Sequence, residues 1–150
     1  MDVDIRIATS AADLEQAAAI HYACLLGNND DRNGGGWVPL DADDDSPREV
    51  VLVAVVDDVV GYAWGDENVD GIAVCQEVAV RSACRRRGVA TKLLRDFGRH
   101  AGIEWSSEWI YLRPLESPWL LDFYRRLGFV DDSTESGYLR VNAEQLTHGG

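Results

Sequence analysis

The stretch from 77 to 94 places a short basic loop between a run of valines and a helical pattern. Within it, Arg85-x-x-Gly88-x-Ala90 opens the helix. The first amides of a helix have no intrahelical partners and carry partial positive charge, so phosphate oxygens are favoured there. Gly88 and Ala90 keep large side chains away from those amides. The sequence therefore predicts a strand, loop and helix unit that binds a pyrophosphate.

Charge is distributed unevenly around this loop. The chain has 26 Asp and Glu against 14 Lys and Arg, a formal net charge of −12, which argues against nucleic acid as a partner. Half of the basic residues nevertheless fall between 81 and 99, opposed there only by Asp96; they are Arg81, Arg85, Arg86, Arg87, Lys92, Arg95 and Arg99. This cluster is either a solvated helix face or a site for a small polyanion. The glycine pattern favours the polyanion, because arginines add charge-assisted hydrogen bonds to phosphate.

Length and composition limit the class of protein. A chain of 150 residues predicts a single domain over 1–150. No apolar run approaches the roughly 20 residues of a membrane span, and the first residues do not resemble a secretory signal. The three cysteines form no CxxC pair, which suits a reducing compartment. We therefore expect a cytoplasmic protein that does not associate with membranes.

Patterns along the chain predict alternating strands and helices. A helix is expected after Ser10, which with Asp13 resembles a capping box, and a second helix is expected to end at a glycine cap, Gly102. A Gly-, Asn- and Asp-rich surface loop is expected over 27–47. The second helix is expected at 91–101 and a third at 118–127. Strands are expected at 5–8, 49–56, 59–64, 69–80 and 109–113, with two short strands near 129 and 138. This order, β-α-β-β-β-α-β-α-β-β, indicates an α/β fold with a mixed sheet.

At two places the residues resemble the GNAT superfamily of acyl-CoA-dependent N-acyltransferases. Arg85, Gly88 and Ala90 fill its signature, [Q/R]-x-x-G-x-[G/A], between a strand and a helix. The segment 117–129 is similar to the late segment of the family, N-x-x-A-x-x-x-Y-x-x-x-G-F, in which Tyr124, Gly128 and Phe129 agree while Ser117 and Leu120 differ. The resemblance covers nearly the whole chain. It implies three layers, with a mixed, mostly antiparallel sheet of six or seven strands and helices on both faces.

The resemblance also implies an activity. Members most often move the acetyl group of acetyl-CoA to a primary amine of a small molecule, protein or peptide, by direct attack in a ternary complex, and many form homodimers. The cofactor-binding residues that it implies are Val78, Ala79, Val80, Arg85, Arg86, Arg87, Gly88, Val89, Ala90, Thr91 and Ser117. The loop amides would hold the pyrophosphate, and the strand at 78–80 would bind the pantetheine amides. The thioester would enter a slot between that strand and the strand at 109–113, where an amide could polarise its carbonyl.

Acetyl transfer to an amine needs a proton acceptor and a proton donor. An amine with a pKa near 10.4 is neutral in only about one molecule in two thousand at pH 7. Glu77 is the candidate base, because it precedes the loop and alternates away from Val78 and Val80; the alternative is an exposed strand acid. Tyr124 is the candidate acid for the CoA thiolate, since the resemblance implies a phenol near that sulfur; the alternative is a core aromatic residue with a bonded hydroxyl.

Other features leave alternatives open. The residues His21, His100 and His148 are scattered and lack metal-ligand spacing, so no metal is expected, and Cys84 is interpreted as incidental. Trp37 and Trp64 are candidates for lining an acceptor pocket. An acidic rim would attract a cationic amine, although a salt-adapted surface explains the same residues slightly better; they are Asp30, Asp31, Asp41, Asp43, Asp44, Asp45, Asp66 and Glu67. The alternative function is a CoA-binding module without acceptor chemistry.

Overall fold

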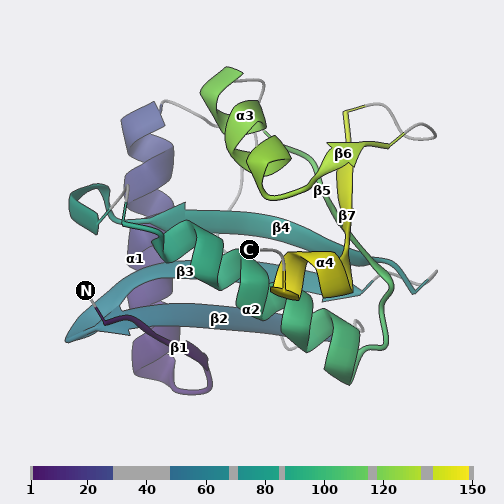
Figure 1. Ribbon diagram of the computed structural model, residues 1–150. Helices are drawn as coiled ribbons and strands as arrows, with labels where there is room; N and C mark the ends of the chain where they lie inside the picture. Colours follow the sequence, from purple (N-terminus) through teal and green to yellow (C-terminus); the bar gives the residue numbers. More distant parts are fainter. Residues whose placement is uncertain are drawn as a thin grey trace.

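The computed structural model describes residues 2–28, 48–67, 71–84, 87–114, 118–132 and 137–148, excluding the side chains of 23–28 and 118–119. These residues form a seven-stranded sheet with the order β1-β2-β3-β4-β5-β7-β6 (Figure 1). The strands are β1 (Asp4–Ile7), β2 (Glu49–Val56), β3 (Asp58–Glu67), β4 (Ala73–Val80), β5 (Trp109–Leu112), β6 (Val130–Asp131) and β7 (Leu139–Asn142). The helices are α1 (Ala11–Asn28), α2 (Val89–Glu104), α3 (Pro118–Arg126) and α4 (Ala143–His148), with a 3-10 turn at Ser82–Cys84.

The sheet is mixed and mostly antiparallel, as predicted. Among the described strands, β4 and β5 form the parallel pair, and the other pairs are antiparallel. The predicted strands at 49–56 and 59–64 form an antiparallel hairpin, with its turn at Asp57, whose φ of 71° is a left-handed conformation that Asp tolerates. Each strand boundary lies within a few residues of its predicted position; the predicted strand at 69–80 begins at Ala73.

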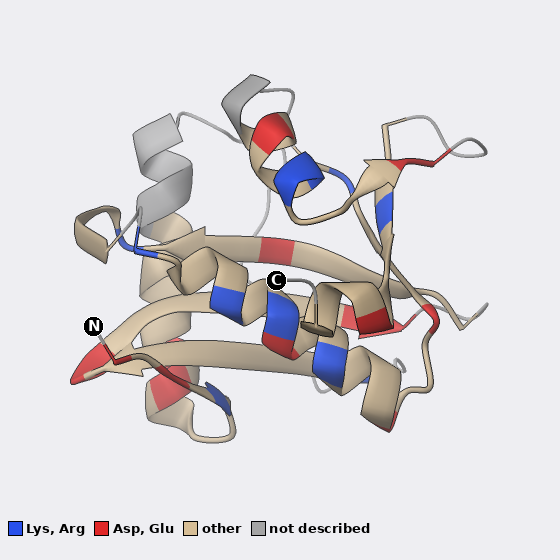
Figure 2. Cartoon of the chain, viewed as in Figure 1, with Lys and Arg blue, Asp and Glu red and all other residues tan. Residues whose placement is uncertain are grey.

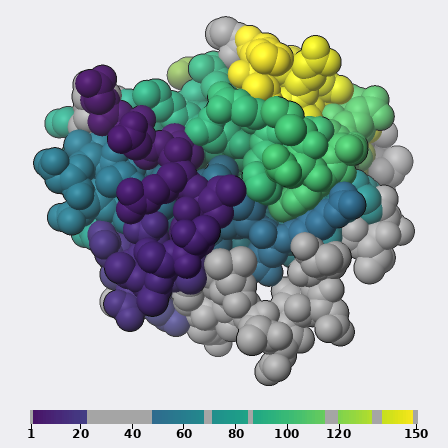
Figure 3. All heavy atoms as spheres, turned by 90° about the horizontal axis from the view of Figure 1, so that it is seen from below, coloured from purple at the N-terminus to yellow at the C-terminus, as the bar shows by residue number. Residues whose placement is uncertain are grey.

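Both faces of the sheet are covered by helices, so the sheet has a hydrophobic core on each side. On one face, α2 and α4 pack over Leu52 and Ala54; on the other, α1 packs over Val51 and Val53. Successive strand residues point to opposite faces, which explains why the valine run of β2 is buried almost throughout. Figure 3, turned to show the lower side of Figure 1, places the N-terminal segment beside α2, with the C-terminal segment on the far side of α2.

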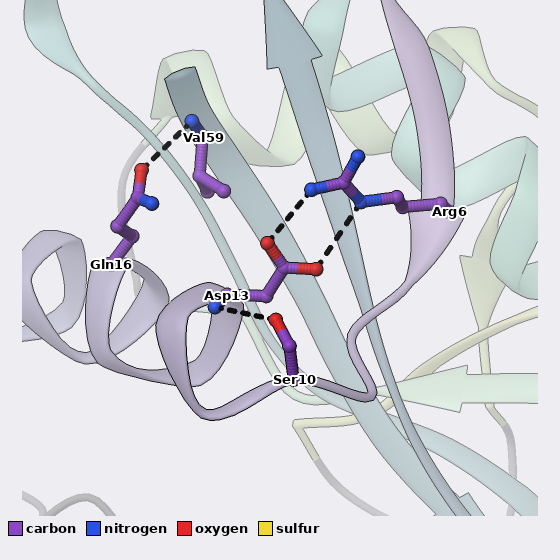
Figure 4. Close-up of polar contacts among 5 residues, drawn as sticks. All are labelled: Arg6, Ser10, Asp13, Gln16 and Val59. Atoms are coloured by element: carbon purple, nitrogen blue, oxygen red, sulfur yellow. Dashed lines mark hydrogen bonds and ion pairs between the residues drawn. The ribbon is translucent and has the colours of Figure 1, made fainter.

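The start of α1 is fixed by polar contacts at its first turn (Figure 4). The Ser10 Oγ accepts a hydrogen bond from the Asp13 amide at 3.1 Å, so the predicted N-cap is confirmed. The Asp13 carboxylate receives both Nη2 and Nε of Arg6, at 2.8 and 3.2 Å, and these bonds hold its pKa below the usual range. Gln16 accepts the amide of Val59 at 3.1 Å, which ties α1 to β3.

The C-terminal part of α2 differs from the prediction. A glycine cap at Gly102 was wrong, because the helix continues to Glu104 and the Trp105 amide closes it on the Ala101 carbonyl at 3.2 Å. A Cβ on Gly102 would lie 3.6 Å from that of Ala143, so this glycine lies where α2 and α4 approach each other closely. The helix α4 itself was not predicted. Most of the predicted loop at 27–47 lies outside the described residues.

Candidate active site

The strands β4 and β5 pair only briefly. Their ladder joins Ala73 to Ile110 and Val74 to Tyr111, while β4 continues to Val80 along β3 (Figure 1). Within the described part of the chain, the β5-facing edge of β4 therefore has no strand partner beyond Val74. Unpaired backbone N–H and C=O groups on such an edge can bind an extended ligand. The predicted slot beside 78–80 corresponds to this edge.

A β-bulge interrupts the pairing of β3 with β4 just before the candidate base. Trp64 pairs with Glu77, whereas the next residue, Gly65, pairs with Cys75. Gln76 is therefore an extra residue in β4, and an extra residue shifts the alternation of side chains by one position. Because of this shift, Cys75 before the bulge and Val78 after it face α2, although they are three positions apart instead of two.

The bulge places Glu77 on the face that α1 covers. Cys75 and Val78 both contribute to the core under α2, and the Glu77 carboxylate contacts two residues on the opposite side. Its Oε1 lies 2.5 Å from Nδ1 of His21, and the Tyr62 hydroxyl donates a hydrogen bond to the same oxygen. The expected alternation of Glu77 away from Val78 is confirmed.

The surroundings of Glu77 are mostly buried. The His21 side chain is 3% exposed and that of Glu77 21%, and Tyr62 is fully buried. Glu77 is the acidic residue of β4, drawn red in that strand in Figure 2. It is thus a half-buried, hydrogen-bonded carboxylate and not the exposed strand acid of the alternative interpretation. Trp64 is half-buried and packs against the core beneath α1.

Sequence reasoning missed both partners of Glu77. His21 was considered only as a metal ligand, although it follows Ala17 and Ile20 at spacings of four and one, on the buried stripe of α1. Tyr62 lies in a strand that is buried continuously from Val59 to Ala63, so periodicity alone does not distinguish it from a core residue. The helical stripe was the available signal for His21, and no local signal predicted its contact with a residue 56 positions away.

The first turn of α2 is an open helix N-terminus. Gly88 precedes it with a φ of 79°, and no side chain caps it. The first intrahelical bond runs from the Lys92 amide to the Gly88 carbonyl at 3.0 Å, so the amides of Val89, Ala90 and Thr91 precede the helical ladder. A Cβ on Gly88 would meet no atom of the described residues within 4 Å. The first turn carries no acidic residue, which favours an anion there.

The structure describes some of the predicted cofactor-binding residues and not others. Arg85, Arg86 and Ser117 lie outside the described residues, and Arg87 is exposed beside Gly88. The side chains of 78–80 pack into the two cores, leaving their backbone along the open edge. Basic residues recur along α2 (Figure 2). Arg81 has a structural contact, because its Nε donates a hydrogen bond to the Val59 carbonyl at 2.9 Å.

Tyr124 lies on α3, against the core under α2. Its ring meets those of Phe123 and Phe129 edge-on, with centroids 5.2 and 5.5 Å away. Its hydroxyl makes no hydrogen bond to the residues that the structure describes. Burial raises the pKa of the phenol, with a smaller contribution from Cys75, which lies where β4 leaves β5. Tyr124 is therefore a neutral phenol at pH 7 and can act as a proton donor.

No group of three or more His, Cys, Asp or Glu side chains among the described residues could hold a metal ion. No helix among them combines the length and the apolar composition that crossing a membrane requires.

Comparison with known proteins links this geometry to a family. The family model "Acetyltransferase (GNAT) domain" matches residues 47–131, more than half of the chain, and this range includes Glu77, Gly88 and Tyr124. No curated protein matches the chain.

Many solved structures share the fold. An acetyltransferase of the GNAT family from Staphylococcus aureus Mu50 has a TM-score of 0.73 at 12% identity, covering 95% of this chain and 99% of that one. Nourseothricin acetyltransferase has a TM-score of 0.66 at 19% identity, with the same coverage. A Bacillus anthracis protein described as a streptothricin acetyltransferase, solved with acetyl coenzyme A, has a TM-score of 0.57 at 19% identity over 65% of this chain and 64% of that one.

Proposed function

Because the chain belongs to the GNAT acetyltransferase family, whose members are acyl-CoA-dependent N-acyltransferases, we propose that it moves the acetyl group of acetyl-CoA to a primary amine by direct attack in a ternary complex. The observation that carries the proposal is the placement of Glu77 and Tyr124. Glu77 contacts α1 and Tyr124 packs against the core under α2, so the two side chains lie on opposite faces of the sheet. A base and an acid on either side of one slot suit acyl transfer.

We propose that the donor binds along the open edge of β4, with its pyrophosphate at the start of α2. The amides of Val89, Ala90 and Thr91, which precede the first hydrogen bond of the helix, support this position. So does the space beside Gly88, which no described residue fills within 4 Å of a Cβ there. The pantetheine arm would pair with the backbone at 78–80. Arg85, Arg86 and Ser117 remain proposed ligands on the basis of the family pattern, and exposed Arg87 is available to a phosphate oxygen.

In the proposed reaction, Glu77 accepts a proton from the ammonium form of the acceptor, directly or through a water molecule. The freed nitrogen lone pair attacks the thioester carbonyl, forming the C–N bond, while an amide near Val78 stabilises the oxyanion. The C–S bond then breaks and Tyr124 protonates the departing thiolate, which leaves as coenzyme A. The proton taken by Glu77 returns to solvent, and the phenol is reprotonated as the amide nitrogen loses its second proton.

The acceptor class is only partly supported by the acidic rim. Two of its acids are described, and both are engaged within the protein: Glu67 accepts from Arg48 at 3.0 Å and from Ser107 at 3.1 Å, and Asp66 accepts from Gln76 at 3.1 Å. The other six lie outside the described residues. Two similar proteins are named for streptothricin and nourseothricin, so these compounds are the first acceptors to assay. The free thiols of Cys75 and Cys84 support a cytoplasmic location.

The test is acetyl-CoA-dependent thiol release across a panel of amines that contains streptothricin, nourseothricin, polyamines and peptides with free amino termini. Calorimetry with coenzyme A measures donor binding in parallel. We expect both binding and turnover, with acetylated product identified by mass spectrometry. Binding without turnover on any amine would instead support a CoA-binding module, and no heat with coenzyme A would remove both functions.

A further inference from the structure

The contacts of Glu77 are one-sided. His21 from α1 and Tyr62 from β3 both meet the same carboxylate oxygen, Oε1, and the Tyr62 hydroxyl also lies 3.4 Å from Nδ1 of His21. The other oxygen, Oε2, makes no hydrogen bond to any residue that the structure describes. The side chain is 21% exposed, and the protein holds one of its two carboxylate oxygens.

The type of partner matters for a base. A separation of 2.5 Å between Nδ1 of His21 and Oε1 of Glu77 requires a proton between the two atoms, and the Tyr62 hydroxyl supplies a second. Imidazole and phenol can both donate as neutral groups. An arginine partner would instead add a full positive charge beside the carboxylate.

The charged and titratable groups around the cluster are few. From α1 the neighbours are His21 and, against the edge of its ring, Tyr22 at a centroid distance of 5.0 Å. From β3 the neighbour is Tyr62, and on β4 itself Cys75 lies two residues away with its Sγ 4.0 Å from the Glu77 carbonyl oxygen. Within the described residues, neither Lys nor Arg contacts the Glu77 carboxylate.

On the basis of the proposed acetyl transfer, we propose that His21 and Tyr62 are positioning residues that hold Glu77 by Oε1 and so present Oε2 to the acceptor amine. The ammonium N–H bond breaks as an O–H bond forms at Oε2, and the electron pair stays on nitrogen for attack on the thioester. Without the two donors the side chain would sample several rotamers, and few of them would place Oε2 near the amine. His21 and Tyr62 need not touch the substrate themselves.

The test compares Tyr62→Phe, His21→Leu and His21→Asn with the wild-type enzyme. Asn retains an N–H donor near the position of Nδ1, whereas Leu retains only volume. Steady-state rates are measured from about pH 6 to 10, with the panel amine of highest turnover, and each variant is checked for folding by thermal unfolding. Tyr138→Phe is the matched control, because it removes a hydroxyl from a ring that lies under Arg113, away from the cluster.

We expect Tyr62→Phe and His21→Leu to lower kcat by roughly 10- to 100-fold, at the low end of the effect of removing a general base. His21→Asn should recover most of the lost kcat, and KM for acetyl-CoA should stay within about twofold in all three variants. Tyr138→Phe should match the wild type.

Several results would overturn the inference. Wild-type rates and pH profiles in both Tyr62→Phe and His21→Leu would show that Glu77 needs no positioning. A His21→Asn variant no better than His21→Leu would assign the two residues a structural role, as would a KM for acetyl-CoA that rises together with the loss of kcat. These results leave the proposed acetyl transfer intact, whereas a wild-type protein that acetylates no amine removes that function and this inference together.

Discussion

The helix N-terminus at Gly88 offers a direct test of donor binding. Gly88 has a φ of 79° and Gly71, before the start of β4, has a φ of 78°. A Cβ on either would meet no atom of the described residues within 4 Å. Replacing either with Trp costs about 1–2 kcal/mol of backbone strain, so the two variants should lose similar stability. Only Gly88→Trp places an indole where the proposed pyrophosphate meets the first amides of α2.

The magnitude follows from those amides. Each hydrogen bond to a charged group contributes about 1.5–3 kcal/mol, and an indole at Gly88 would exclude the pyrophosphate from at least two of the three amides of Val89, Ala90 and Thr91. Losing two such bonds costs about 3–6 kcal/mol, which corresponds to roughly a 10²- to 10⁴-fold higher Kd.

Calorimetry with coenzyme A measures this Kd, and thermal unfolding measures the shared strain. We expect Gly88→Trp to lose affinity at that scale while Gly71→Trp binds within about threefold of the wild type. The reasoning would be refuted by wild-type affinity in Gly88→Trp, or by an equal loss in both variants, since strain and not the helix N-terminus would then explain the effect.

Three further outcomes are expected. Tyr124→Phe should slow the chemical step by roughly 10²- to 10⁴-fold if the phenol protonates the thiolate, and an unchanged single-turnover rate would remove that role. Asp13 has a lowered pKa in the folded state, so its contribution to stability is present above the unfolded pKa and is lost as pH falls through the folded value. Asp13→Asn should therefore lose less Tm than the wild type between about pH 5 and pH 2, and parallel losses would contradict the linkage. Gly65→Ala should lower the free energy of unfolding by about 1–3 kcal/mol in denaturant, because its Cβ would lie 2.4 Å from Phe97 ring atoms. Gly102→Ala, whose Cβ lies at an ordinary contact distance, should raise it by about 0.5–1 kcal/mol, and a reversed order would contradict the packing argument.

Local patterns were sufficient for much of the fold. The β-branched runs predicted the hairpin strands, Ser10 predicted the start of α1, and the glycine in the basic loop predicted the start of a helix. Each of these signals is local, because a strand pattern or a helix cap is defined by a few neighbouring residues. The family resemblance supplied the layer arrangement, which the solved structures confirm. In contrast, Gly102 misled the prediction, because a glycine inside a helix looks the same in sequence as a glycine that ends one.

Taken alone, the sequence determined the strand and helix order, the basic loop at the helix start and the two candidate catalytic residues, Glu77 and Tyr124. Only the tertiary structure decided what surrounds them. The bulge at Gln76 depends on how β4 pairs with β3, and this register decides which face receives Glu77. The contact of Glu77 with His21 then depends on packing α1 against that face. Periodicity is encoded locally, whereas register and packing join residues far apart in the chain. The partners of the Glu77 carboxylate could therefore be identified only from the tertiary structure.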